Sequence, residues 1–274
     1  PITVEHCQFL YNDQQNLNYP QLNLTASESV IVRNNIVTGD RTKTRGGGVM
    51  VADLMGVATS PQTLIESNTV TDNRYGIALY SGQTAVVRDN IVRDNNTETT
   101  PANGGSGINI YDVTGTQNTV ITGNLIEGNL WGVTIIGGGN INLGKTDNPE
   151  AADYNPGENI FYNNGNEGVV YDLYNNSANT VYAQGNYWKT AAEQTQEAIE
   201  DVIFHQHDNP ALGEVIFMPF ADDTTVGIAQ QEGASVRAAT VCYDLQGRRV
   251  PAGTVRRGLN IMRNGTAVTK VLVK

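Results

Sequence analysis

The chain has 274 residues, of which 28 are acidic, 17 are basic and 39% are hydrophobic, so it is long enough to bury a substantial core. No run approaches the roughly 18 to 20 apolar residues that span a bilayer, and we expect no membrane span. Pro1 leads directly into a strand-like segment, so any signal peptide is expected to have been removed. The net charge of −11 repels phosphate backbones and predicts no nucleic-acid partner.

A repeated pattern dominates the first two hundred residues. Each copy has an apolar triplet, then an Asn and a second apolar pair, and the four best copies occupy residues 30–37, 63–70, 85–92 and 119–126. Their aligned residues are Asn35, Asn68, Asn90 and Asn124. Asn tolerates the left-handed backbone of a tight bend, and stacked Asn side chains can hydrogen-bond between copies. A degenerate first copy has Cys7 in place of Asn, and weaker late copies pass through Asn164 and Asn186.

The second half of each copy begins with Gly and alternates apolar residues with others, which predicts strands with one buried face. These segments are residues 48–51, 76–79, 107–110, 132–135 and 168–171. The spacing from Asn68 to Asn90 is 22 residues. That is too short for a strand and a crossover helix, but it accommodates three short strands and three bends. Each copy is therefore predicted to be one coil of a parallel β-helix.

These coils resemble the right-handed parallel β-helix repeats of the pectate-lyase-like superfamily. The resemblance covers residues 1–220 and implies an all-β solenoid of about seven coils. An acidic helix, with Thr190 and Glu193 at capping-box spacing, is expected to cover the last coil. The superfamily includes lyases, hydrolases, esterases, epimerases and non-catalytic members, so the resemblance specifies the fold and leaves the reaction open.

The C-terminal part has a different character. Residues 221–233 are predicted to be a linker and residues 234–274 a small β module, and residues 237–274 carry eight Lys or Arg against Asp244 alone. The module resembles the C-terminal sorting domain that Bacteroidetes-type bacteria use for type IX secretion. This implies a secreted or cell-surface protein whose tail contacts the secretion machinery. The alternative is an ordinary terminal β-hairpin.

The superfamily resemblance implies that a ligand lies on the outer face of the Gly-led strands. Long loops at residues 40–48 and 95–107 are expected to form the walls of a slot over the third coil. Strand alternation directs one set of residues outward: Met50, Ala52, Ala78, Tyr80, Asn109, Tyr111, Thr134 and Ile136. That floor has no acidic, basic or His side chain, whereas lyase and hydrolase chemistry requires such groups.

Aromatic and amide groups make the slot a candidate sugar-binding site. Tyr80 and Tyr111 occupy equivalent positions in adjacent coils, about 5 Å apart at regular strand spacing, and form an apolar ledge for a sugar face. Arg74, Tyr75 and Asn109 are the further candidate substrate-binding residues. The alternative is a Tyr stack covered by the loops.

Three carboxylates near the slot are the candidate catalytic residues. Asp53 and Asp112 lie just beyond the floor, roughly 10 Å apart, near the upper limit for an inverting carboxyl pair. Asp72 is the third candidate. An Asp at the start of a turn commonly caps backbone N–H groups instead.

Other charged residues suggest no cofactor. Arg33, Glu66 and Arg88 fall at one point of successive coils and predict a surface ion-pair ladder. An acidic insertion at residues 140–158 could offer oxygen ligands to Ca²⁺, but it lacks EF-hand-like spacing and is expected to be a solvated loop. Its acidic residues are Asp147, Glu150, Asp153 and Glu158. The three His residues are too dispersed for a zinc motif, so no metal site is expected.

Three functions remain open. The first is a β-helix protein that binds a polysaccharide, on its own or as the remaining coils of a larger carbohydrate-active protein, with a neutral glycan favoured by the acidic charge. The second is an active polysaccharide lyase or glycoside hydrolase. The third is a structural or adhesive surface protein.

Overall fold

The computed structural model describes residues 1–53, 60–100, 103–165 and 168–222, together with four strands nearer the C-terminus. The chain divides into two compact units, Pro1–Val226 and Gly227–Lys274.

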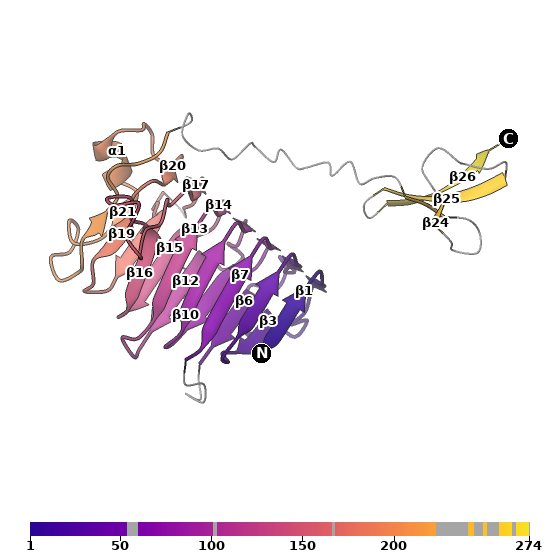
Figure 1. Ribbon diagram of the computed structural model, residues 1–274, viewed down its shortest axis with the longest axis horizontal. Coiled ribbons are helices and arrows are strands. Elements are labelled where there is room, and N and C mark those ends of the chain that lie inside the picture. Colours follow the sequence, from indigo (N-terminus) through magenta and orange to yellow (C-terminus); the bar gives the residue numbers. More distant parts are fainter. Residues whose placement is uncertain are drawn as a thin grey trace. The chain divides into compact units, whose positions relative to one another are not determined.

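The first unit is a solenoid of three parallel sheets, and each turn of the chain adds one strand to each sheet (Figure 1). Sheet A consists of β1 (Ile2–Glu5), β4 (Val30–Arg33), β7 (Gln62–Glu66), β10 (Thr84–Arg88), β13 (Asn118–Thr122), β16 (Asn140–Gly144), β19 (Val181–Ala183) and β22 (Val215–Ile216). Sheet B consists of β2 (Gln8–Leu10), β5 (Ile36–Thr38), β8 (Thr69–Thr71), β11 (Ile91–Arg93), β14 (Leu125–Glu127), β17 (Ile160–Tyr162) and β20 (Tyr187–Trp188). Sheet C consists of β3 (Pro20–Thr25), β6 (Gly47–Ala52), β9 (Ile77–Tyr80), β12 (Ser106–Asp112), β15 (Trp131–Gly137), β18 (Leu173–Asn176) and β21 (Ile203–Phe204). The predicted parallel β-helix of about seven coils is confirmed.

The core is built from columns of inward side chains that stack from coil to coil. In sheet A, Val32 pairs with Ile65, Ile65 with Val87, and Val87 with Ile121. All four side chains have no exposed surface. The predicted buried column is confirmed, because period-two alternation directs every second side chain into the solenoid.

The predicted Asn ladder is also present in the bend between sheets A and B. The side chain of Asn68 donates to Val32 O at 2.9 Å and to Asn90 Oδ1 at 3.0 Å, and its backbone N–H also donates to Asn90 Oδ1. The same bonds join Asn90 to Asn124. The ladder residues do not themselves have the left-handed backbone. The residue before each one does, with φ between 54° and 65° at Asn34, Ser67, Asp89 and Gly123.

The late repeats differ from the sequence prediction. The ladder continues from Asn124 to Asn159 and Asn186, whereas Asn164 closes a second ladder. That second ladder lies in the bend between sheets B and C and comprises Asn73, Asn95, Asn129 and Asn164. The insertion at residues 145–158 lengthens the spacing between the late repeats. For this reason the sequence pattern places Asn164 in the wrong bend.

The fifth Gly-led strand was also assigned wrongly. Residues 173–176, not 168–171, pair with β15, and Asp172 occupies the position of the leading Gly. The inward position of this strand includes Asn175, which is fully buried and donates to the carbonyls of Asn179 and Gly213. A polar inward residue broke the alternation that would have identified the strand.

A short helix, α1 (Gln196–Glu200), follows the last strand of sheet B. Its N-cap is Thr195, whose side chain accepts from Ala198 N. The predicted cap at Thr190 is wrong, because the Thr190 hydroxyl donates to Asp172 at 2.8 Å. Ile199 is fully buried in the core, so the helix does cover apolar surface of the last coils.

The second unit contains an antiparallel sheet in the order β24, β23, β25, β26. Its strands are β23 (Val241–Tyr243), β24 (Arg249–Val250), β25 (Gly258–Asn264) and β26 (Ala267–Val273). These strands form the predicted small β module. Most of the predicted linker at residues 221–233 lies outside the described residues. Within the described part of the chain, no helix has the length and apolar character to cross a bilayer.

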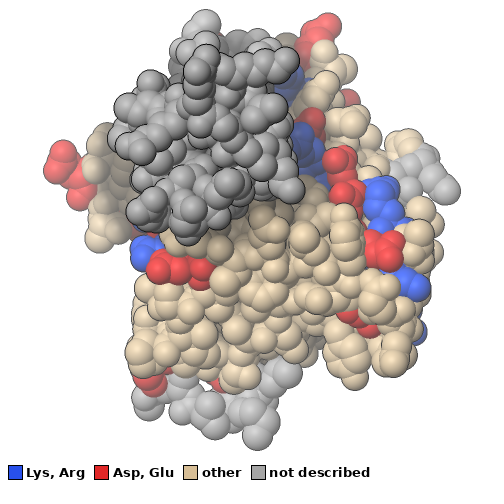
Figure 2. All heavy atoms as spheres, turned by 90° about the vertical axis from the view of Figure 1, so that its right-hand side faces the viewer, with Lys and Arg blue, Asp and Glu red and all other residues tan. Residues whose placement is uncertain are grey.

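Charged side chains form the predicted ladder on the outer surface. Arg33 contacts Glu5 at 2.6 Å and Glu66 at 3.9 Å, and Arg88 contacts Glu66 at 2.6 Å. Figure 2 shows basic and acidic side chains next to one another along one margin of the molecule. Exposed pairs of this kind contribute little to stability, because water and salt screen the attraction.

Candidate functional site

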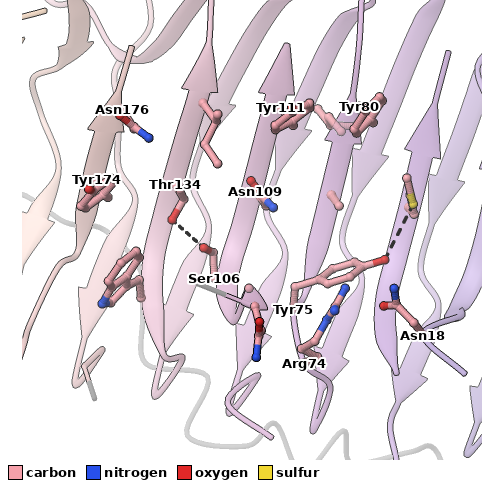
Figure 3. A pocket seen from close by; sticks show the side chains of 17 residues that line it. Asn18, Arg74, Tyr75, Tyr80, Ser106, Asn109, Tyr111, Thr134, Tyr174 and Asn176 are labelled. Atoms are coloured by element: carbon pink, nitrogen blue, oxygen red, sulfur yellow. Dashed lines mark hydrogen bonds between the residues drawn. The ribbon is translucent and has the colours of Figure 1, made fainter. Parts of the chain in front are cut away.

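The outer face of sheet C carries a cleft of about 730 Å³ (Figure 3). Strands β6, β9, β12, β15 and β18 form its floor. Asn103 and Gly104, from the predicted loop 95–107, line one part of it. Asn18 lines another part and comes from the loop between β2 and β3, whereas residues 40–47 contribute nothing to the lining. The second wall was therefore assigned to the wrong loop.

Strand alternation places the floor residues on the inward and outward sides of the strands as predicted. The inward residues are fully buried: Val49, Val51, Ile77, Leu79, Ile108, Ile110, Val133 and Ile135. Among the outward residues, Met50, Ala78, Asn109 and Thr134 are aligned in one row across four strands. The register places a second row, including Tyr80, Tyr111 and Ile136, beside the first.

Tyr80 and Tyr111 stack on each other, with ring centroids 4.7 Å apart and an interplanar angle of 18°. Both rings are partly exposed, so the loops do not bury them. Because each ring covers one face of the other, a sugar cannot lie flat across both. It can contact the ring edges and hydroxyls, or the face of Tyr80 that is turned away from Tyr111 and toward the small side chain of Ala52.

A second aromatic group, which the sequence prediction missed, lines the same cleft. Trp131 and Tyr174 stack at 4.8 Å and 9°, and Tyr174 stacks in turn on Phe204 at 4.5 Å. Trp131 directly precedes the Gly of its coil, as Tyr75 does in an earlier coil, and this spacing could have identified it. Tyr174 could not be found, because its strand had been misaligned.

Tyr75 is packed into the floor. Its ring lies so close to Gly47 that a Cβ there would approach within 2.1 Å of the ring, and only Gly fits at that position. Its hydroxyl lies 3.8 Å from Met50 Sδ (Figure 3). Burial raises the pKa of Tyr75 to about 12, so the phenol is neutral. Its ring forms a fixed support for the Arg74 guanidinium, which lies 5.2 Å from the ring centroid.

Hydrogen-bonding capacity remains unused in the cleft. Ser106 and Thr134 satisfy each other at 2.5 Å. By contrast, Arg74 Nε, Asn109 Oδ1 and Trp131 Nε1 are shielded from solvent and have no hydrogen-bond partner among the described residues. An unpaired buried polar atom costs about 1 to 3 kcal/mol. Three of the seven such atoms in the described part of the chain belong to residues that line this one cleft.

The structure does not place Asp112 in the cleft. The side chain is 1% exposed and accepts hydrogen bonds from the backbone N–H groups of Thr114, Gly115 and Gln117 and from the Thr114 hydroxyl. Burial acts to raise the pKa of Asp112, but these hydrogen bonds outweigh it and the net pKa is lowered. The carboxylate organises a turn.

Asp53 and Asp72 are also absent from the lining of the cleft. Asp53 follows β6, where its backbone N–H donates to Tyr80 O. Asp72 occupies a left-handed position in the bend after β8 and pairs with Arg41 at 2.9 Å. The predicted binding residues Arg74, Tyr75, Tyr80, Asn109 and Tyr111 thus converge on one cleft, and the three candidate catalytic carboxylates do not join them.

The carboxylates of the acidic insertion contact different partners. Asp153 contacts Lys145 at 2.6 Å, and Asp147 accepts from Gln184. Nowhere in the described ranges do three or more His, Cys, Asp or Glu side chains converge as metal ligands.

The chain was compared with known proteins and families. No curated protein and no solved structure matches it. One family, described as the right handed beta helix region, matches residues 2–148, which is more than half of the chain. That range contains the coils that carry most of the cleft. The stacked parallel sheets and this match together show that the chain belongs to the right-handed β-helix family.

Proposed function

We propose that this protein binds a polysaccharide in the cleft of sheet C. One observation carries the proposal: the cleft combines Tyr75, Tyr80, Tyr111, Trp131 and Tyr174 with amide and hydroxyl side chains, and no described lining residue is a carboxylate. Aromatic rings pack against the apolar C–H groups of sugars, while amides and hydroxyls orient the sugar hydroxyls.

The size of the cleft supports the same ligand class. Small-molecule sites commonly measure about 300 to 1,000 Å³. At 730 Å³ the cleft is large enough for a short oligosaccharide segment. It extends across five strands of sheet C, so a chain molecule can contact several coils at once.

Binding is favoured over catalysis by the position of the carboxylates. Glycoside hydrolysis requires two carboxyl groups on either side of the scissile bond, and uronide elimination requires a base with a cation or metal. Asp112 is committed to a turn, and neither Asp53 nor Asp72 lines the cleft. A lyase or hydrolase is therefore the alternative proposal, and a structural or adhesive role is the third.

The second unit supports a proposal about location. It is an antiparallel sheet that forms a compact unit of its own, and residues 237–274 carry a local charge of +7 against −18 for the rest of the chain. A separate basic module on an acidic body fits a sorting signal for secretion. The protein is accordingly proposed to act outside the cell or at its surface.

The binding proposal is tested with the double variant Tyr80→Ala and Tyr111→Ala on a glycan array, followed by calorimetry with the best oligosaccharide. Loss of the two rings should weaken binding by roughly 1 to 3 kcal/mol. Tyr154→Ala is the matched control, because Tyr154 is 42% exposed and lies outside the cleft. Equal affinity of the double variant and the parent for the glycan would refute the site.

Assays for new reducing ends and for unsaturated uronides, run on the same glycans, separate binding from catalysis. The parent protein is expected to release neither product. Turnover that Asp53→Asn or Asp112→Asn abolishes would establish the enzyme alternative instead.

A further inference from the structure

Arg74 is the one basic residue among the described residues that line the cleft. No carboxylate of the described residues lies within 4.0 Å of its guanidinium, in contrast to Arg33, Arg41, Arg88 and Arg93, which all have such partners. The side chain lies along the ring of Tyr75, as Figure 3 shows. Its Nε has no hydrogen-bond partner among the described residues. The guanidinium is thus held in place by packing and not by an opposite charge.

The surroundings of Arg74 favour the binding of an anionic group beside it. Burial lowers the pKa of Arg74 from its ordinary value, and the neighbouring charge of Arg45 acts in the same direction, while Tyr75 and Glu98 act against both. A guanidinium nevertheless remains charged in proteins, so these effects destabilise the empty site without removing the charge. The attraction of an anionic group placed beside Arg74 would offset both the cost of desolvating the guanidinium and the repulsion from Arg45.

No other described residue that lines the cleft carries a charge. The other lining residues are aromatic, aliphatic, amide, hydroxyl or Gly residues. The protein as a whole carries a net charge of −11, which repels a densely charged polymer. One cation in an otherwise neutral cleft matches a ligand that carries one negative charge within the bound segment.

We infer that the cleft recognises a predominantly neutral glycan bearing a single acidic substituent, and that Arg74 binds the oxygen atoms of that substituent. The inference rests on the proposed carbohydrate-binding function and refines it. A guanidinium binds a carboxylate or a sulfate through two parallel hydrogen bonds, so either substituent has the required chemistry. Arg74 precedes the start of β9 and Tyr80 ends it, so the rings of Tyr80 and Tyr111 at the other end of the cleft would then contact the uncharged sugars of the same chain (Figure 3).

Matched oligosaccharides test this inference. Gluco-, galacto-, manno- and xylo-oligosaccharides are immobilised in three forms: neutral, with one uronate, and with one sulfate. An oligogalacturonate serves as the densely charged probe. One of the singly charged forms should bind at least tenfold more tightly than its neutral counterpart, because a charge-assisted, two-pronged contact with a guanidinium is stronger than a neutral hydrogen bond. This preference should decline with added salt, because screening weakens the ionic contact.

Variants of Arg74 identify the group responsible. Arg74→Gln should reduce the ratio of acidic to neutral affinity to about one, and Arg74→Lys should restore only part of it because the two-pronged geometry is lost. Arg93→Gln removes a positive charge outside the cleft and should leave the ratio unchanged.

The outcomes separate the inference from the function on which it rests. Neutral forms that bind as tightly as singly charged ones, or oligogalacturonate that binds most tightly, would overturn the inference and leave carbohydrate binding intact. No binding to any probe would overturn both. A preference for the uronate or for the sulfate form identifies the substituent.

Discussion

Asp172 shows how one residue can set the pH response of this fold. It occupies a position where earlier coils have Gly, and its side chain has no exposed surface. Asn164 and Thr190 donate to its Oδ1, while its Oδ2 has no partner among the described residues. Burial raises the pKa of Asp172 to about 7, against the two hydrogen bonds that lower it. The fold therefore favours the protonated carboxyl.

This raised pKa predicts that stability declines with increasing pH. Below the unfolded pKa of 3.8 the carboxyl is neutral in both states, whereas between 3.8 and about 7 the folded state binds more protons than the unfolded state. The free energy of unfolding should fall through this window and stay low above it. Asp172→Asn should flatten the profile and increase stability at pH 8 by roughly 1 to 3 kcal/mol, measured by urea unfolding.

Asp153→Asn provides the opposite control. Its hydrogen bond with Lys145 lowers the pKa of Asp153, so its contribution is present above the unfolded pKa and is lost as the pH falls. If Asp172→Asn and the parent protein show parallel stability profiles from pH 4 to 8, the buried carboxyl does not control the pH response.

At the scale of the strands, the solenoid depends on register. Each short strand pairs with its equivalents one coil before and after, so a given inward residue touches the same column throughout the stack. A strand of three to five residues has little stability by itself. Its neighbours and the buried Asn ladder at its end hold it in place.

Ile65→Asp is expected to be severely destabilising. The side chain lies between Val32 and Val87 in a dry column, where an unpaired charge costs several kcal/mol against a total stability of about 5 to 15 kcal/mol. Leu64→Asp is the matched control, because Leu64 precedes Ile65 on the same strand and is directed to the outer face. Thermal unfolding monitored by circular dichroism should show a large loss for Ile65→Asp and a much smaller one for Leu64→Asp. Similar melting of both variants would contradict the buried column.

At the scale of the whole molecule, the chain is organised as two units with different sheets. The strands of the three sheets in the coils pair in parallel, whereas the C-terminal strands pair antiparallel. Parallel coils propagate through contacts with adjacent coils. The coils therefore have their own core, and the second unit forms a separate sheet.

Deletion of residues 227–274 tests this division. We expect the thermal transition of the coils to remain nearly unchanged, because the core consists of residues from the first unit. In the native host, the deletion should abolish surface delivery if the tail is the export signal. Fractionation with an antibody against the coils measures the second effect. Collapse of the coils on deletion would show that the tail belongs to their fold, and normal surface delivery would refute its role in export.

The sequence was sufficient to predict the architecture, because each coil of the β-helix is formed by residues that lie close together in the chain. A repeat whose shortest spacing is 22 residues, a recurring Asn and period-two alternation are each visible within a short stretch of sequence. They are enough to predict the parallel sheets, the column at Ile65 and the Asn ladder. They also predicted that Tyr80 and Tyr111 would be neighbours, since residues at equivalent points of adjacent coils must lie about one strand spacing apart.

Other features became visible only in the tertiary structure, because they do not follow the repeat. The insertion at residues 145–158 and the polar Asn175 interrupted the pattern, so Tyr174 and its stack with Trp131 became visible only in the folded chain. The lack of a carboxylate within 4.0 Å of Arg74 among the described residues is equally non-local, because it depends on where side chains from distant coils lie. Alternation along a strand determines whether a side chain points inward or outward. The charged residues around it and the loops that line the cleft follow no repeat, so the alternation does not predict them.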